Sequence, residues 1–165
     1  MAHRTRRELD GRFTAVLGRQ VSVRQLHSIL FIEPDDSRDM YAYYLRESGF
    51  TVQTADTTDD GLRRASDADV IVTWIRVPGS CDEVELVRRL RNSDATTHTP
   101  VIVLTACGSE VEQWRALVAG CDMFLQKPCP PERLVNEIRW VLTHGRLALP
   151  QPARAHLNHR NRRAS

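Results

Sequence analysis

The stretch SILFIEPDDSRDMYAYYLRESGFTVQTA, residues 28–55, decides the fold. It opens with SILFIE, a continuous apolar run of strand length that ends in an acid. Apolar residues at positions 40, 41, 44 and 45 then follow at helical spacing until Gly49 stops the pattern. FTVQTA (50–55) alternates as a second short strand. The stretch therefore predicts a strand, a helix and another strand in series.

The same alternation continues downstream. The patterns predict helices over 57–66, 84–92, 109–120 and 130–142, and strands over 69–74, 100–106 and 121–128. Thr57 or Thr58 and Ser109 are suited to cap helices, Gly120 to stop one, and Pro131 to open one. Five such units in series require a parallel sheet with helices on both faces. We expect an α/β fold with a five-stranded, doubly wound parallel sheet.

Charge is distributed unevenly along the 165 residues, whose net charge is +2. Residues 1–27 carry +4 and residues 143–165 carry +5, which leaves −7 for residues 28–142. The tail PQPARAHLNHRNRRAS has no apolar periodicity and is predicted to be disordered. VLGRQVSV (16–23) is either an extra strand or helix packed on the domain or part of a disordered leader. We expect three segments: a basic extension (1–26), a folded domain (27–143) and a basic tail (144–165).

Composition argues against several classes of protein. The chain has no apolar run of membrane-spanning length, and its charged start, MAHRTRRELDGR, is unlike a signal peptide. We therefore expect a cytoplasmic protein without membrane association. The four cysteines form no CxxC pair and predict reduced thiols without a zinc site. No Ser-His-Asp or Cys-His arrangement has a motif context, so an enzyme is not expected.

Polar side chains stand where the predicted strands end, at the edge where open parallel sheets bind ligands. The first strand ends in EPDD (33–36), the fourth in Thr105 and the fifth in Lys127. Carboxylates, a hydroxyl and an ammonium at one edge are typical of a phosphate or divalent-metal site. The third strand is the exception, because DVIVTWIRVPG (69–79) has the large indole of Trp74 at its end.

The ordered pieces ILFIEPDD, VTWIRVPG, VIVLTA and FLQKP resemble the receiver domains of bacterial two-component response regulators over residues 27–143. The resemblance implies a flavodoxin-like fold with a phosphoacceptor aspartate at the end of the third strand. It also implies an acidic pair that binds Mg²⁺ at the end of the first strand. In this sequence it makes Thr105 the switch hydroxyl, Lys127 the site lysine and Phe124 the aromatic switch residue.

Two positions depart from the family pattern. Trp74 stands where the phosphoacceptor belongs, counted from either end of DVIVTWIRVPG. The acidic pair reads Glu33-Pro34, which leaves Glu33 and Asp35 as a weakened metal site because Pro34 has no side-chain oxygen. An aspartyl phosphate needs a carboxylate nucleophile and a metal, and an indole supplies neither. We expect no cofactor other than weakly bound Mg²⁺.

These departures predict a single-domain signalling protein of a two-component or phosphorelay system that acts without phosphorylation. Trp74 could hold Thr105 and Phe124 in one arrangement, so that the output face is constitutive. That face comprises the fourth helix, fifth strand and fifth helix, and it would bind a histidine kinase, a regulator, an effector or a second copy of the chain. Most of its large apolar residues are expected to be core: Val111, Trp114, Trp140 and Leu142.

Three alternatives stay open. A conventional phosphorylated receiver could use Asp35 or Asp36 as its acceptor, although neither lies on the third strand. The basic arms could bind nucleic acid in a salt-sensitive and sequence-tolerant way, although neither arm shows a helix-turn-helix pattern. A redox role could use Cys81, Cys107 and Cys129, which follow strands at the same sheet edge; small, partly buried thiols are the simpler interpretation.

Overall fold

The computed structural model describes residues 26–34, 36–74, 79–106 and 109–146. The predictions for the basic extension, the basic tail, Asp35 and Cys107 lie outside these residues. Strands and helices alternate in the described ranges: β1 (Ser28–Ile32), α1 (Ser37–Glu47), β2 (Thr51–Ala55), α2 (Thr58–Arg64), the 3-10 turn η1 (Ala65–Asp67), β3 (Val70–Thr73), α3 (Glu83–Asn92), β4 (Val101–Thr105), α4 (Glu110–Ala119), β5 (Met123–Gln126) and α5 (Pro131–His144).

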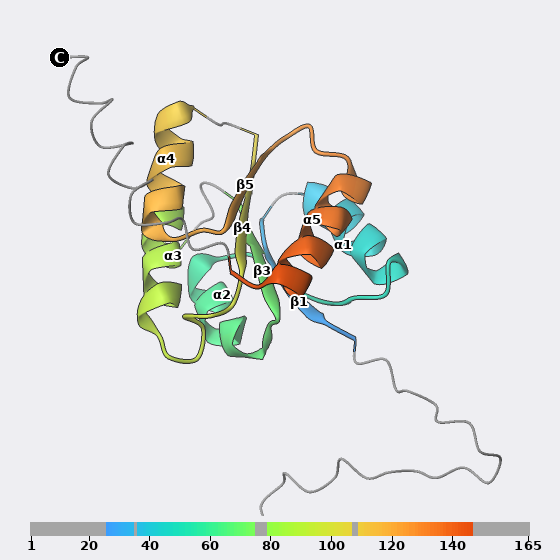
Figure 1. Ribbon diagram of the computed structural model, residues 1–165, viewed down its shortest axis with the longest axis horizontal. Coiled ribbons are helices and arrows are strands. Elements are labelled where there is room, and N and C mark those ends of the chain that lie inside the picture. Colours follow the sequence, from blue (N-terminus) through green and yellow to red (C-terminus); the bar gives the residue numbers. More distant parts are fainter. Residues whose placement is uncertain (1–25, 35, 75–78, 107–108, 147–165) are drawn as a thin grey trace, which may run out of the picture.

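The five strands form one parallel sheet in the order β2-β1-β3-β4-β5. Helices α1 and α5 cover one face, and α2, α3 and α4 cover the other (Figure 1). The predicted doubly wound α/β fold is therefore confirmed. The chain reverses its direction of strand addition between β1 and β3, and in such sheets the ligand crevice lies beyond the carboxyl ends of the strands at this point. Within the described residues, none of the helices has the length and apolar character needed to cross a membrane.

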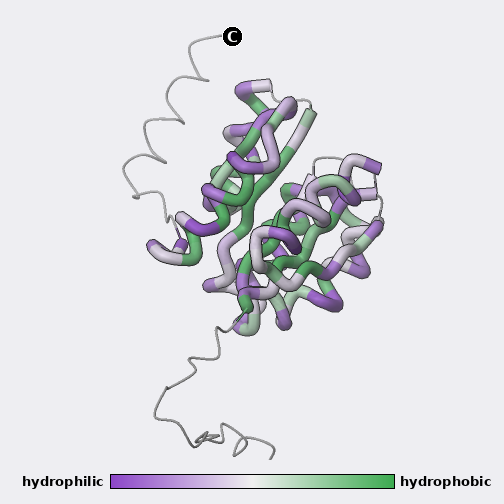
Figure 2. Tube along the Cα trace, turned by 90° about the vertical axis from the view of Figure 1, so that its right-hand side faces the viewer, coloured by the Kyte–Doolittle hydropathy of each residue, from purple (hydrophilic) through white to green (hydrophobic). Residues whose placement is uncertain are grey.

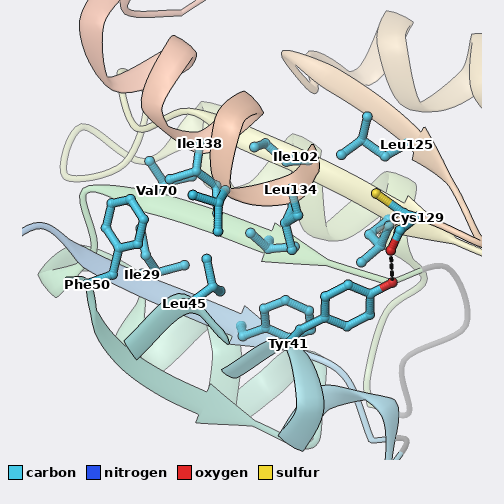
Figure 3. Packing of buried hydrophobic residues seen from close by; sticks show 14 of the residues in the cluster. Ile29, Tyr41, Leu45, Phe50, Val70, Ile102, Leu125, Cys129, Leu134 and Ile138 are labelled. Carbon is cyan, nitrogen blue, oxygen red and sulfur yellow. Dashed lines mark hydrogen bonds between the residues drawn. The ribbon is translucent and has the colours of Figure 1, made fainter. Parts of the chain in front are cut away.

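Alternate residues of each strand supply two separate cores. Ile29 and Phe31 of β1 pack with α1 and α5, whereas Leu30 and Ile32 pack with the helices of the opposite face. Figure 3 shows the first of these cores, and Figure 2 shows hydrophobic residues following the strands through the interior. Every residue of β3 and β4 is buried, because both faces of these central strands are covered.

Helix termini follow the capping signals in the sequence. The Thr57 side chain accepts a hydrogen bond from the Asp60 amide at 3.2 Å, so Thr57 rather than its neighbour caps α2. Ser109 and Glu112 form a reciprocal capping box at the start of α4. Gly120 ends that helix with a φ of 109°, a left-handed conformation that glycine adopts without strain.

The prediction that most large apolar residues of α4 and α5 are core is wrong for two of them. Val111 and Trp140 are exposed, while Trp114 and Leu142 are partly buried. In α5 the buried stripe comprises Leu134, Val135, Ile138 and Val141, and Trp140 falls outside it. Helical spacing alone did not reveal which side of the helix would meet the sheet.

A buried ion-pair network closes the amino-terminal edge of the sheet, opposite the candidate site. Asp122 accepts hydrogen bonds from Arg91 at 2.7 Å, from Arg146 at 3.2 Å and from the Val101 amide at 2.9 Å. Arg91 also donates to the carbonyl of Gly120 at 2.9 Å. Burial lowers the pKa of Arg91, and Asp122 opposes that shift. No local sequence pattern indicated this network, which joins α3, β4, β5 and the end of α5.

Candidate functional site

Backbone hydrogen bonds hold the candidate residues at the carboxyl edge of the sheet. The Trp74 amide donates to the Ile32 carbonyl at 3.1 Å, which fixes Trp74 directly after β3 and beside the end of β1. The Lys127 amide donates to the Thr105 carbonyl at 2.7 Å, which joins the ends of β5 and β4. Four strand ends that are far apart in sequence thus meet at one edge, as the strand pattern predicted.

A buried ion pair lies at the centre of the site. The Lys127 ammonium pairs with Oε1 of Glu33, whose side chain is completely buried, and it donates to Ser37 Oγ at 2.8 Å. Ser37 Oγ in turn donates to Glu33 Oε1 at 2.8 Å. Glu33 Oε2 is buried and has no hydrogen-bond partner among the described residues. A buried charge needs a partner of opposite sign, and here each charge has the other.

Two aromatic rings complete the surroundings of the Lys127 ammonium. Its Nζ lies 4.8 Å from the centre of the Trp74 ring and 5.6 Å from that of Tyr41. Both distances are in the range at which a ring face attracts a cation. Trp74 is partly buried and packs against the core on the α2, α3 and α4 side. The indole is therefore part of the candidate site.

Tyr41 joins the candidate site to the core of the α1 and α5 side. Its hydroxyl donates to the Cys129 carbonyl at 2.7 Å, as the dashed line in Figure 3 shows, and its ring stacks on Phe31. Burial raises the pKa of Tyr41, and the nearby Cys129 and Glu33 raise it further. Burial also raises the pKa of the Cys129 thiol, which favours its protonated, less reactive form.

The predicted switch residues lie beside this centre. Thr105 is fully buried at the end of β4. Phe124 of β5 is partly buried and packs against the same core as Trp74. Cys81 is partly buried on that side too, and Cys129 is buried beyond β5. The structure thus brings Glu33, Trp74, Thr105 and Lys127 to one edge, with Phe124 along the adjoining face.

The described donor set does not fit Mg²⁺, which requires several oxygen ligands. Glu33 offers one carboxylate, and its Oε1 is already bound to Lys127 and Ser37. Neither Pro34 nor Trp74 adds a side-chain oxygen. Within the described ranges no group of three or more His, Cys, Asp or Glu side chains could hold a metal ion. Asp35, the second expected ligand, lies outside these ranges, so the weakened metal site stays a prediction.

Sequence reasoning missed Ser37 and Tyr41. Glu33, Ser37 and Tyr41 follow one another at intervals of four residues. Ser37 and Tyr41 belong to α1, where this spacing places side chains on one face of the helix. Arg38, also missed, donates to the Glu33 carbonyl at 3.3 Å and forms an ion pair with Asp56. The four-residue spacing could have indicated that Ser37 and Tyr41 share a helix face. Only the way α1 crosses the end of β1 shows that this face is turned toward Lys127.

Comparisons with known proteins agree on the family. The model of the response regulator receiver domain matches residues 29–139. The transcriptional regulatory protein AfsQ1 of Streptomyces coelicolor is 36% identical over 121 residues, which cover 72% of this chain and 52% of AfsQ1. The phosphate regulon transcriptional regulatory protein PhoB of Escherichia coli is 29% identical over 117 residues, 69% of this chain and 51% of PhoB. The chain therefore spans about half the length of these relatives.

Solved structures show the same fold. A putative response regulator from Chloroflexus aurantiacus superposes with a TM-score of 0.68 at 27% identity, covering 72% of this chain and 99% of that one. The chemotaxis response regulator CheY4 of Vibrio cholerae gives a TM-score of 0.65 at 26% identity, covering 70% and 98%. With its strand order, its strand-end residues and these matches, the chain belongs to the family of response regulator receiver domains, the signalling modules of two-component systems.

Proposed function

We propose that this receiver domain signals without phosphorylation, through contact with a protein partner, and that Trp74 occupies the phosphoacceptor position. One observation carries the proposal. The Lys127 ammonium is already enclosed by the Glu33 carboxylate, the Ser37 hydroxyl and the rings of Trp74 and Tyr41. A lysine held in this way is not free to bind an incoming phosphoryl group.

The chemistry of the candidate site supports the same conclusion. Covalent phosphorylation requires a nucleophilic oxygen within reach of the phosphoryl donor, and the indole of Trp74 has none. The face of the indole instead attracts the Lys127 ammonium as an acceptor carboxylate would, but without adding a negative charge. Glu33 and Lys127 then balance each other. The charges of these two side chains need neither a phosphoryl group nor a metal ion to neutralise them.

A single arrangement of the side chains around Lys127 implies a single arrangement of the output face. Trp74 and Phe124 pack against the same core. We infer that the indole, by occupying part of that core, restricts the arrangements open to Phe124 and to the strand that bears it. A receiver held in one arrangement presents one α4–β5–α5 face, and a partner binds it without a preceding modification. Exposed apolar side chains on that face support protein contact: Val111, Val118 and Trp140. Receiver domains as a family interact with kinases and effectors, and a protein of one of these classes is the proposed partner.

The test is phosphorylation by acetyl phosphate and Mg²⁺, followed by the intact mass. We expect no phosphoryl mass on the native chain and a phosphoryl adduct on a Trp74→Asp/Pro34→Asp variant, which restores a nucleophile and a second acidic residue after Glu33. Trp140→Asp/Pro130→Asp is the matched control, because it makes the same exchanges at exposed positions of α5 and its N-cap. A native chain that gains the adduct at Asp35 or Asp36 would overturn the proposal in favour of conventional phosphorelay signalling.

A further inference from the structure

Helix α1 has apolar side chains on two opposite faces. Tyr41, Ala42 and Leu45 are buried, and Tyr41 and Leu45 belong to the core shared with the sheet and α5. Met40, Tyr43 and Tyr44 point outward and are 45%, 59% and 40% exposed. A helix on the surface of a globular domain normally has a single apolar stripe. The outer stripe of Met40, Tyr43 and Tyr44 is called the outer α1 face below. It belongs neither to the candidate site nor to the α4–β5–α5 face.

The outer α1 face is a continuous patch. Its residues follow the i, i+3, i+4 spacing that places side chains next to one another on a helix. The rings of Tyr43 and Tyr44 meet edge to face, with their centres 6.0 Å apart. Single exposed apolar residues are common on protein surfaces, but a cluster that contains two ordered aromatic rings indicates a contact surface.

The chain enters the domain beside this helix. Leu26, which is 56% exposed, stands two residues before β1. The Thr51 amide donates to the His27 carbonyl at 2.9 Å, so the entry point pairs with the start of β2. Only the short connection after Glu47 separates that point from the end of α1. The first described residues, Leu26 and His27, therefore lie close to the carboxyl end of α1.

We propose that residues 13–25 of the same chain pack on the outer α1 face. Phe13, Val16 and Leu17 have the same i, i+3, i+4 spacing as the patch, so they can present a matching apolar stripe. Reach is sufficient, because the eight residues 18–25 extend to about 26 Å, whereas the 11 residues of α1 are about 16 Å long.

The contact has a consequence that is independent of Trp74 and of phosphorylation. A protein that binds the outer α1 face must first displace residues 13–25, so the segment lowers the apparent affinity of this face for any partner. The α4–β5–α5 face, which lies on other elements, stays accessible. The chain would then have one open contact face and one face covered by its own N-terminal segment.

Nitration of tyrosine by tetranitromethane tests the contact on the full chain, which contains only Tyr41, Tyr43 and Tyr44. We expect Tyr43 and Tyr44 to react several-fold faster in a Phe13→Ser/Leu17→Ser variant than in the native chain. Buried Tyr41 reports on folding and should react equally slowly in both. Leu147→Ser/Leu149→Ser makes equivalent changes beyond α5 and should match the native chain. Equal nitration of Tyr43 and Tyr44 in all three proteins would overturn the inference.

A photo-cross-linker in place of Tyr44 identifies the occupant. We expect the cross-linked product to have the mass of one chain and to join position 44 to a peptide within residues 13–25. Mixing isotopically labelled and unlabelled chains separates contacts within one molecule from contacts between two. A product that joins two chains, or one that joins position 44 to residues 147–165, would contradict packing of the chain's own N-terminal segment.

Discussion

The two edges of the sheet each contain a buried carboxylate paired with a basic side chain, yet the two sites differ in how completely the carboxylate is satisfied. At the amino-terminal edge Asp122 accepts hydrogen bonds from two arginines and a backbone amide. At the carboxyl edge Glu33 uses one oxygen for Lys127 and Ser37, and its other oxygen has no partner among the described residues.

The difference distinguishes a network that ties segments of the fold together from a candidate binding site. Asp122 and its arginines tie helix ends and loops together, and both oxygens of the carboxylate accept hydrogen bonds. Glu33 and Lys127 instead lie at the crevice where open parallel sheets bind ligands. Buried polar groups without a hydrogen-bond partner are uncommon in folded proteins, so Glu33 Oε2, which has no partner among the described residues, distinguishes the candidate site from the Asp122 network.

The largest expected effect is at the amino-terminal edge. Asp122→Ala removes the partner of the buried Arg91 and of Arg146, and it leaves the Val101 amide without an acceptor. We expect the free energy of unfolding to fall by about 3–5 kcal/mol, measured by urea denaturation. Asp94→Ala, at an exposed position, serves as the control. A loss no larger than that of the control would mean that the network is not structural.

A smaller effect is expected from Glu33→Gln at the carboxyl edge. Lys127 keeps Ser37 and both rings, and its side chain is slightly more exposed than that of Arg91, 14% against 10%. We expect a loss of about 1–3 kcal/mol in the free energy of unfolding, measured in the same way. Glu132→Gln in the exposed first turn of α5 is the matched control. A loss equal to that of Asp122→Ala would remove the contrast between the two edges.

Trp74 provides a test of the ring contact itself. Trp74→Phe keeps an aromatic face near Lys127 and should cost less than about 1 kcal/mol, whereas Trp74→Ala loses that face and some packing and should cost about 1–2 kcal/mol. Thermal and urea unfolding of both variants measure the difference. Equal losses would show that the indole acts by volume alone.

The smallest effect concerns pH and Tyr41. The pKa of Tyr41 is raised above its ordinary value of 10.0 by burial in the folded protein. Below pH 10.0 the tyrosine is neutral in both states, and its contribution to stability is complete. As the pH rises further, the unfolded chain loses the proton first, so the folded state is destabilised.

We therefore expect the free energy of unfolding of the native chain to fall more steeply above pH 10 than that of Tyr41→Phe. The raised pKa values of Cys121, about 12, and of Cys129 act in the same direction in both proteins. Comparison of the two proteins thus isolates the tyrosine. Parallel pH profiles would mean that Tyr41 ionises in the folded protein as readily as it does in the unfolded chain.

Much of the candidate site could be predicted because its residues follow strands. Glu33, Trp74, Thr105 and Lys127 each stand at or just after the end of an apolar run, and parallel strands bring their carboxyl ends to one edge. Ser37 and Tyr41 could not be assigned in this way. They belong to α1, and their contribution depends on how that helix crosses the end of β1.

The sequence by itself determined the α/β class, the order of strands and helices, the caps at Ser109 and Gly120, and the absence of a nucleophilic oxygen at Trp74. These properties depend on local periodicity, on backbone conformation and on the chemistry of one side chain. Only the tertiary structure decided that Lys127 lies between two rings, that Asp122 joins two arginines, and that α1 has a second apolar face exposed. Those arrangements depend on packing between segments far apart in the chain, about which local patterns hold no information.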